Sequence, residues 1–326
     1  MRLALAKFGL MIPQGWRLDL PRDRSPTEQF ELMIKIAEEI ERLGFDSGFL
    51  YDHLITYPTI TTESCFECYT SLAAIAMRTS KLRLGQLVTC TSYRNPALVA
   101  KMAATLDVIS GGRLEFGIGA GWYEHEYQAY GYRFESPSVR IRQLREAVQI
   151  IRKMWTEEKA TFHGKYFSVD GAINSPKPIQ KPHPPIMIGG NGEKLTLKAV
   201  ARLADRSDLS AAITLDECVR KFGIIDQHCR DFGRDPSTIE RTLHREVYVA
   251  RDGRAARSRA LQSKPSGMSE EAFLKSRIIG DPKECASQFN DYVEQAGVRY
   301  FILRAPDAVE LESLRLLAGE VFPNVK

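Results

Sequence analysis

Apolar and polar positions follow two different periods that alternate along this chain. Short apolar runs of strand length are followed, again and again, by longer segments in which apolar residues recur at helical spacing. The segment 27–44 shows the helical spacing well, with Phe30, Ile34 and Leu43 on one side and Gly44 at its end. The pattern therefore predicts eight successive strand–helix units.

The bounds of these units follow from where each period begins and ends. The predicted strands span 5–12, 46–54, 82–90, 113–121, 185–190, 206–211, 239–250 and 298–304. The predicted helices span 27–44, 69–79, 95–112, 138–155, 193–204, 215–233, 281–297 and 308–323.

Eight such units in parallel close into a (β/α)8 TIM barrel, which is the fold class that the pattern favours. We expect one barrel domain over 1–326, with insertion segments at its C-terminal mouth over about 156–184 and 251–280. The first insertion is rich in proline and glycine and predicts a hairpin and loop, whereas the second is polar and irregular for most of its length. An open, doubly wound sheet is the alternative, and it would need a switch point in the strand order.

Composition and charge narrow the classes of function. Hydrophobic residues make up 44% and charged residues 26% of 326 positions, which is typical of a globular protein. A net charge of +4 without a Lys/Arg-rich tract argues against a nucleic-acid partner, although it suits an anionic cofactor. No apolar run approaches the ~20 residues that cross a bilayer. Lys7 interrupts the apolar start, so we expect a first strand rather than a leader, a cytoplasmic protein and no membrane partner.

The cysteines give little sign of metal or redox chemistry. Cys65 and Cys68 form a C-x-x-C pair, but no second pair and no nearby histidine completes a zinc site. We therefore interpret the two as neighbours at the start of a helix and predict no metal site.

The stretch 114–131, "LEFGIGAGWYEHEYQAYG", combines alternating glycines with aromatic and charged residues. Gly117, Gly119 and Gly121 let the backbone come close to a neighbouring group. A dinucleotide fingerprint fits poorly, because the third glycine comes one residue early and no acidic residue ends a strand about 20 residues on.

A second glycine-rich turn lies at 188–205. The strand ends at Gly189, Gly190, Asn191 and Gly192, and a helix opens by Thr196. Exposed amides and the helix dipole make such a turn a seat for phosphate. A plain strand–helix turn is the alternative.

The sequence "YDHL" places Asp52 and His53 at the end of a predicted strand. An acid beside a histidine in a pocket would assist proton transfer. A satisfied polar pair that closes the loop is the alternative, and the spacing does not decide between them.

Four segments together, 44–54, 82–113, 114–131 and 186–209, resemble the bacterial luciferase-like monooxygenase superfamily. Within it the chain is most similar to the members that use the deazaflavin coenzyme F420. The similarity extends to the late "IIGDPKECASQFNDYVEQAGVRYFIL". The run "NPALVAKMAATLDVISGGRLEFGIGAGWYEHEY" is specific for the superfamily and much less so for the choice of flavin.

The resemblance implies a cofactor lying across the C-terminal mouth of the barrel. Asp52 and His53 would lie near its ring, with His53 as the proton partner. The resemblance also implies a cis peptide between Leu87 and Val88 that buttresses the flavin, followed by Thr89.

The same resemblance assigns further cofactor contacts. Those around the ring or tail would be Gly119, Gly121, Trp122 and Glu124, and those holding phosphate Gly189, Gly190, Asn191, Gly192 and Thr196. Arg94 and Lys194 are candidates for contact with an acidic tail, although either side chain is equally suited to solvation.

The function expected from the resemblance is an F420-dependent oxidoreductase that transfers a hydride between C5 of the deazaflavin and a small organic substrate. The alternative is an FMNH2-dependent monooxygenase that inserts oxygen from O2. A flavin-free barrel enzyme acting on a phosphorylated metabolite, and a flavin-binding protein without turnover, also stay open. A homodimer is kept open as the assembly.

Overall fold

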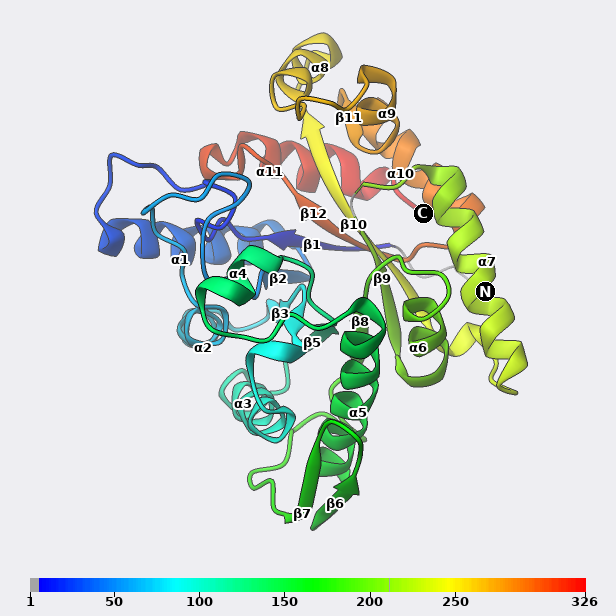
Figure 1. Cartoon of the computed structure of the whole chain (residues 1–326). Helices are drawn as coiled ribbons and strands as arrows, with labels where there is room; N and C mark the ends of the chain where they lie inside the picture. The colour runs from blue at the N-terminus through cyan, green and yellow to red at the C-terminus, as the bar shows by residue number, and fades with distance from the viewer. Residues whose placement is uncertain (1–5, 211) are drawn as a thin grey trace.

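The computed structural model describes residues 6–210 and 212–326, so the predicted strand positions Leu5 and Ala211 lie outside the described residues. Eight parallel strands close into a barrel in the order β1, β2, β3, β5, β8, β9, β10 and β12, which pairs with β1 again. Figure 1 shows the helices around this barrel. The TIM-barrel prediction is confirmed. The strands are β1 (Lys7–Met11), β2 (Ser47–Leu50), β3 (Arg83–Gln86), β5 (Leu114–Gly119), β8 (Ile186–Gly189), β9 (Arg206–Leu209), β10 (Glu240–Val249) and β12 (Tyr300–Arg304).

Each barrel strand is followed by a helix that packs its apolar face outside the sheet. Helix α1 begins at a capping box. The Ser25 side chain accepts a hydrogen bond from the Glu28 amide, and the Glu28 side chain accepts one from the Ser25 amide. The helices are α1 (Pro26–Leu43), α2 (Cys68–Arg78), α3 (Pro96–Ile109), α5 (Pro137–Thr156), α6 (Thr196–Leu203), α7 (Leu215–Asp231), α10 (Pro282–Ala296) and α11 (Glu312–Leu316). Short 3-10 turns span Thr91–Tyr93, Pro236–Thr238, Ala308–Glu310 and Phe322–Asn324.

The last helix is less regular than the predicted 308–323. It is divided by Leu311, whose φ of 63° is left-handed, and it continues beyond α11 as a π-helical turn over Leu317–Val321. A β-branched or long side chain at positive φ is strained, so a helix cannot run through that position unbroken.

Side chains fill the barrel from its N-terminal end. Phe49 is fully buried inside, and a Cβ on Gly9 would lie 3.1 Å from the Phe49 ring, so the glycine makes room for it. Below this ring, Tyr300 donates a hydrogen bond of 2.6 Å to Ser47. This part of the interior is therefore a packed core, and a hollow lies at its C-terminal end.

The two insertions lie at different ends of the barrel. The hairpin of β6 (Ala160–His163) and β7 (Ser168–Ala172) confirms the predicted hairpin. It lies at the N-terminal end, where Gln180 accepts a hydrogen bond from Arg83 at the start of β3. The sequence placed this segment at the mouth, but α5 carries the chain to the opposite end, as Figure 1 shows.

The insertion 251–280 does lie at the mouth, and it is more regular than expected. It contains α8 (Gly253–Gln262), α9 (Glu270–Lys275) and β11 (Ile278–Gly280), which pairs with the end of β10. The sequence did not predict the two short helices, because only Ala256, Ala260 and Phe273 are buried in them and so few apolar positions give no clear helical period.

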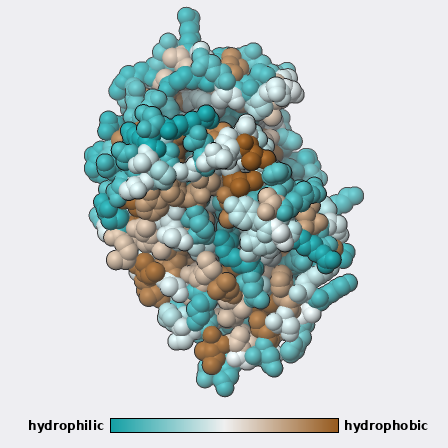
Figure 2. All heavy atoms as spheres, turned by 60° about the vertical axis from the view of Figure 1, so that its left-hand side comes forward, coloured by the Kyte–Doolittle hydropathy of each residue, from teal (hydrophilic) through white to brown (hydrophobic). Residues whose placement is uncertain are grey.

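The outer surface has no extended apolar patch on the face that Figure 2 shows, where hydrophobic side chains are scattered among hydrophilic ones. Among the described residues, no helix combines the length and the apolar character that crossing a membrane demands.

Candidate active site

A cavity of about 660 Å³ opens at the C-terminal end of the barrel. Its walls come from the ends of all eight barrel strands and the loops that follow them. Of the fourteen residues predicted to form the site, eleven line it: Asp52, His53, Leu87, Val88, Gly119, Gly121, Trp122, Gly189, Gly190, Gly192 and Thr196. Parallel strands bring these segments together because their carboxyl ends meet at one rim.

His53 is held by a residue that the sequence analysis did not identify. Its Nδ1 lies 2.7 Å from Oε2 of Glu126, and its ring stacks on Trp16 with centroids 4.2 Å apart. Nε2 has no hydrogen-bond partner in the part of the chain that the structure describes. A carboxylate at Nδ1 fixes the imidazole orientation and tautomer, which leaves Nε2 to exchange a proton in the cavity.

Glu126 is a fully buried carboxylate with four donors around it. It accepts hydrogen bonds from the amides of Leu54 and Ile55 at 2.5 and 3.1 Å, and from the hydroxyl of Tyr93 at 2.5 Å. Burial works against its charge, but the hydrogen bonds from His53, Tyr93 and Leu54 together lower its pKa below the usual value. It is therefore ionised beside His53.

The predicted residue Glu124 lies outside the cavity. It is exposed and accepts a hydrogen bond of 3.1 Å from the side-chain Nε2 of Gln128. After the glycines the chain forms a short helix, α4 (Glu124–Ala129), which turns Glu126 inward and Glu124 outward. Helical spacing does not reveal this, because Glu124, three positions before the buried Tyr127, is the glutamate that the spacing would place on the same face.

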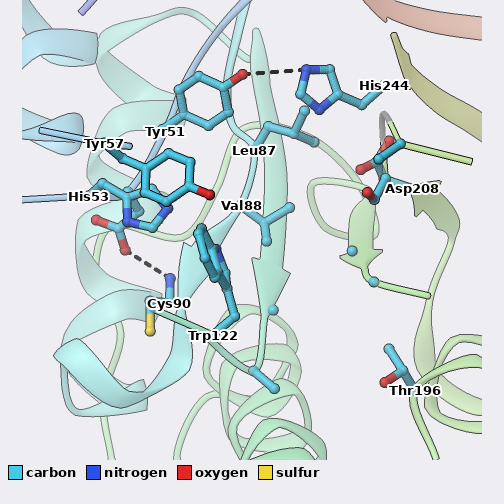
Figure 3. Close-up of a pocket in the computed structure, with 18 of the residues that line it drawn as sticks. Tyr51, His53, Tyr57, Leu87, Val88, Cys90, Trp122, Thr196, Asp208 and His244 are labelled. Atoms are coloured by element: carbon cyan, nitrogen blue, oxygen red, sulfur yellow. Dashed lines mark hydrogen bonds between the residues drawn. The ribbon is translucent and has the colours of Figure 1, made fainter. Parts of the chain in front are cut away.

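Asp52 does not hold His53; its carboxylate joins neighbouring segments of the cavity rim. Its Oδ2 accepts hydrogen bonds from the Cys90 amide at 2.8 Å and from Arg94 at 2.7 Å, as Figure 3 shows for Cys90. Arg94 also pairs with Glu67 at 2.8 Å, so its charge is used within the protein. Lys194 is exposed and does not line the cavity.

The Leu87–Val88 peptide is cis, as the resemblance implies. Both residues line the cavity, whereas Thr89 is buried behind them in β4 (Thr89–Cys90), where its hydroxyl bonds Tyr69 at 2.8 Å. Thr89 supports this wall without facing the cavity.

The alternating glycines of β5 approach the protein's own side chains. A Cβ on Gly119 would lie 2.7 Å from Val88, and one on Gly121 would lie 1.8 Å from the hydroxyl of Tyr127. Gly121 also has a φ of +72°, which favours glycine. The glycines thus let Val88 and Tyr127 approach the strand, which shapes the cavity wall.

The second glycine turn forms the adjoining wall, because it follows β8, which pairs with β5, and Thr196 is visible at the lower right of Figure 3. Helix α6 begins at Thr196 without a side-chain cap, and a Cβ on Gly192 would lie 2.8 Å from the Thr196 hydroxyl. The Gly190 amide already donates to the Asp208 carbonyl at 3.0 Å, and Asn191 accepts from the Ser210 amide, outside the cavity. The available donors are therefore fewer than the turn suggested.

Two polar residues of the deep wall were also missed. Burial raises the pKa of Asp208 to about 7 and lowers the pKa of His244 to about 3. The Tyr51 hydroxyl lies 3.3 Å from Nε2 of His244, and Oδ1 of Asp208 is buried without a partner in the described residues. In Figure 3 Asp208 faces the cavity across from Trp122. No pattern along the chain singles out these positions, because both lie inside ordinary strands.

No group of three or more His, Cys, Asp or Glu side chains within the described residues is arranged to hold a metal ion. Cys65 and Cys68 are free thiols, and Cys68 begins helix α2. The interpretation of the two as helix neighbours holds for Cys68 only, because Cys65 lies in the loop before the helix.

Comparisons with known proteins agree with the fold. The sequence model of the family described as luciferase-like monooxygenase matches residues 7–276. An F420-dependent glucose-6-phosphate dehydrogenase of Intrasporangium calvum is 26% identical over 97% of this chain and 99% of its own length. An FMNH2-dependent dimethylsulfone monooxygenase of Pseudomonas putida is 29% identical over 48% of this chain and 42% of its own length.

Among solved structures, an F420-dependent secondary alcohol dehydrogenase in complex with an F420-acetone adduct superimposes with a TM-score of 0.81. It is 23% identical and covers 99% of this chain and all of its own. At this identity the likeness concerns the fold alone.

Proposed function

Because the chain belongs to the luciferase-like monooxygenase family, we propose that it is an F420-dependent oxidoreductase. In this proposal it transfers a hydride between C5 of the deazaflavin and a small organic substrate. The similarity to an F420-dependent relative extends over 97% of this chain, whereas the similarity to the FMNH2-dependent relative extends over 48%. The full-length similarity supports F420 over FMN.

One observation carries the proposal: Glu126 holds Nδ1 of His53 at 2.7 Å, while Nε2, which has no partner among residues 6–210 and 212–326, faces the cavity. A deazaflavin exchanges hydride with a substrate carbon, and the accompanying proton needs an acid or base of its own. Nε2 of His53 takes the proton from a substrate hydroxyl when the adjoining carbon gives up hydride, and returns it in the reverse reaction. Glu126 stabilises the imidazolium that results.

The cavity fits a flavin-type cofactor at both ends. Leu87 and Val88 offer an apolar support for a ring, and Gly192 with Thr196 offers a hydroxyl and an uncapped helix terminus for phosphate. A side chain on Gly192 would fill the space beside the Thr196 hydroxyl, so the glycine keeps this contact open.

The aromatic rim limits the access of water to His53, whose side chain is 12% exposed. Trp122 lies edge-on to Tyr57 at 5.3 Å, and Trp16 covers the face of the imidazole. Removing water from such a site strengthens the interaction between Glu126 and His53.

An FMNH2-dependent monooxygenase is the second candidate function, supported by the similarity to the dimethylsulfone monooxygenase. The same glycine turn and the same histidine suit FMN, so the cavity by itself does not discriminate between the two cofactors.

The test is to measure the dissociation constants of F420 and FMN for the purified protein, and then hydride transfer with a panel of secondary alcohols and enones. The proposal predicts that F420 binds at least about tenfold more tightly, a difference of about 1.4 kcal/mol. A lower dissociation constant for FMN, with O2-dependent product formation, would favour the second candidate instead.

A further inference from the structure

A cluster of three arginines surrounds one carboxylate on a cavity wall that the proposed function does not use. Arg277 lies 2.9 Å and Arg17 4.0 Å from Glu246, and Arg304 forms a close ion pair with the same carboxylate. All four residues line the cavity. They come from separate segments, so only the closed barrel brings them together. We call them the arginine wall.

The arginine wall carries more positive charge than its own carboxylate neutralises. Burial raises the pKa of Glu246, but Arg304 and Arg277 outweigh it and hold the pKa below the usual value, so Glu246 is ionised. Three guanidinium groups therefore face one carboxylate. Asp19 is the next acidic group near Arg304. Burial raises the pKa of Asp19, which disfavours the negative charge that would offset Arg304.

These charges are only partly exposed to water. The side chains of Arg17, Arg277 and Arg304 are 25%, 9% and 16% exposed. Guanidinium groups with little water around them are stabilised by a partner of opposite charge. A surplus of such groups lining a cavity is thus a binding site for an anion that enters it.

The arginine wall lies on a different arc of the barrel from the groups assigned to the cofactor. Leu87, Gly119 and Gly190 belong to the ends of β3, β5 and β8, which are neighbours in the sheet. Glu246 and Arg304 belong to the ends of β10 and β12, and Arg17 follows β1, which pairs with β12. His53 follows β2, beside β1, so it lies where the two arcs meet.

Arg17 is held in place for contact with a ligand. Its guanidinium lies over the rings of Trp16 and Tyr57, at 5.4 and 5.2 Å from their centroids. Its distance of 4.0 Å from Glu246 makes it the weakest ion pair of the three. Stacking fixes the planar group without using up its hydrogen-bond donors.

We infer that the arginine wall binds an oxyanion of the substrate, a carboxylate or a phosphate monoester, and so holds the reacting carbon beside His53. This inference rests on the proposed function, because it names the substrate class for the same site. The substrate is then a small organic anion that carries a secondary alcohol, or the corresponding carbonyl compound. The anion fixes the substrate at one end, and Nε2 of His53 contacts the oxygen at the other.

The test uses matched pairs of charged and neutral secondary alcohols as probes, by isothermal titration with and without F420. β-Hydroxybutyrate is compared with its methyl ester, and glycerol phosphate with glycerol, so the two arms distinguish carboxylate from phosphate. We expect at least one anion to bind roughly tenfold or more tightly than its neutral counterpart. Arg17→Gln and Arg277→Gln should each weaken that anion by roughly 10- to 100-fold, which is typical of a lost charged hydrogen bond, and leave the neutral probe unchanged.

Arg251→Gln is the matched control, since Arg251 follows the same strand but is mostly exposed, pairs with Glu320 and does not line the cavity. Arg17→Gln leaves Glu246 with its two closer partners, so this variant should fold even where Arg277→Gln does not. Equal affinities within both pairs of probes, or anion affinities unchanged in Arg17→Gln, would overturn the inference. Loss of F420 affinity with no loss of anion affinity would also overturn it and assign the arginine wall to the cofactor.

The two proposals fail separately. Anion binding to the protein without F420 tests the arginine wall even if F420 does not bind. Conversely, F420 turnover with neutral alcohols only would keep the proposed function and reject the anionic substrate.

Discussion

Nδ1 of His53 and Oε2 of Glu126 lie 2.7 Å apart although 73 positions separate the two residues in the chain. His53 follows β2, and Glu126 belongs to α4, a short helix after β5. The pair gives the histidine a fixed orientation and a buried negative charge, and the first two predictions test what each of the two residues contributes.

Replacing His53 with alanine should affect turnover far more than cofactor binding. Loss of a general acid–base group typically lowers the rate by ~10²–10⁴-fold, whereas the dissociation constant of F420 should change only a few-fold. Single-turnover rates and titration of F420 measure the two effects. A variant that loses affinity and rate together would show that His53 binds the cofactor rather than moving a proton.

Replacing Glu126 with glutamine should keep the hydrogen bond to the Leu54 amide but remove the charge beside His53. The imidazolium is then less stable, so the pH–rate profile should move to lower pH and the rate should fall by ~10-fold or more. Glu124→Gln is the matched control, since that side chain is exposed and outside the cavity. Equal profiles for the two variants would count against a role for Glu126 in proton transfer.

The phosphate contact should depend on the hydroxyl of Thr196. Thr196→Val preserves the shape and removes the donor, so the dissociation constant of F420 should rise by ~10-fold, as for a lost hydrogen bond to a charged group. Gly192→Ala should have the same direction, because its Cβ would lie 2.8 Å from that hydroxyl. Thr105→Val, on the exposed side of α3, is the control. Unchanged affinity in both site variants would support a plain turn.

Asp208 should make stability fall as the pH rises. Its pKa is about 7 in the folded protein against an ordinary 3.8, because burial disfavours the charge. Between these values the folded state holds a proton that the unfolded chain has released, so the stabilising contribution is present below about pH 4 and lost by about pH 7. The free energy of unfolding of the wild type, minus that of Asp208→Asn, should fall by up to about 1.4 kcal/mol per pH unit in this window.

Urea unfolding at several pH values between 4 and 8 measures this difference. Subtraction of the variant also removes the opposite contribution of His244, whose lowered pKa makes stability rise with pH. Asp23→Asn, at an exposed position, should give a difference that does not change between pH 5 and 7. A flat difference for Asp208→Asn would mean that its carboxyl is ionised throughout.

Two glycines should respond to alanine in opposite directions. Gly223 lies within α7, is exposed and has open space where a Cβ would lie, so Gly223→Ala should stabilise the protein by about 0.5–1 kcal/mol. A Cβ on Gly9 would lie 2.3 Å from the Ser47 hydroxyl, so Gly9→Ala should destabilise by about 1–3 kcal/mol. Chemical denaturation of both variants checks the two signs, and a stabilising Gly9→Ala would contradict the packing described for Phe49.

The barrel was predictable because each of its strands is followed by a helix of clear period. The eight predicted strands correspond to β1, β2, β3, β5, β8, β9, β10 and β12. A predicted strand extends well beyond the observed one where the chain runs into the mouth. The predicted strand 46–54, for example, is observed as Ser47–Leu50, because Tyr51 to His53 leave the sheet and line the cavity.

Local periodicity and turn chemistry determined the fold class, the hairpin after α5, and the position of His53 and the glycine turn at strand ends. These are properties of neighbouring residues, whose backbone preferences and apolar spacing act over one element. The tertiary structure alone decided that Glu126 rather than Glu124 or Asp52 holds His53, that β5 glycines accommodate Val88 and Tyr127, and that three arginines meet at Glu246. Closing the barrel brings these side chains together from distant segments, and the pairing of buried charges depends on distances in space that no spacing along the chain records.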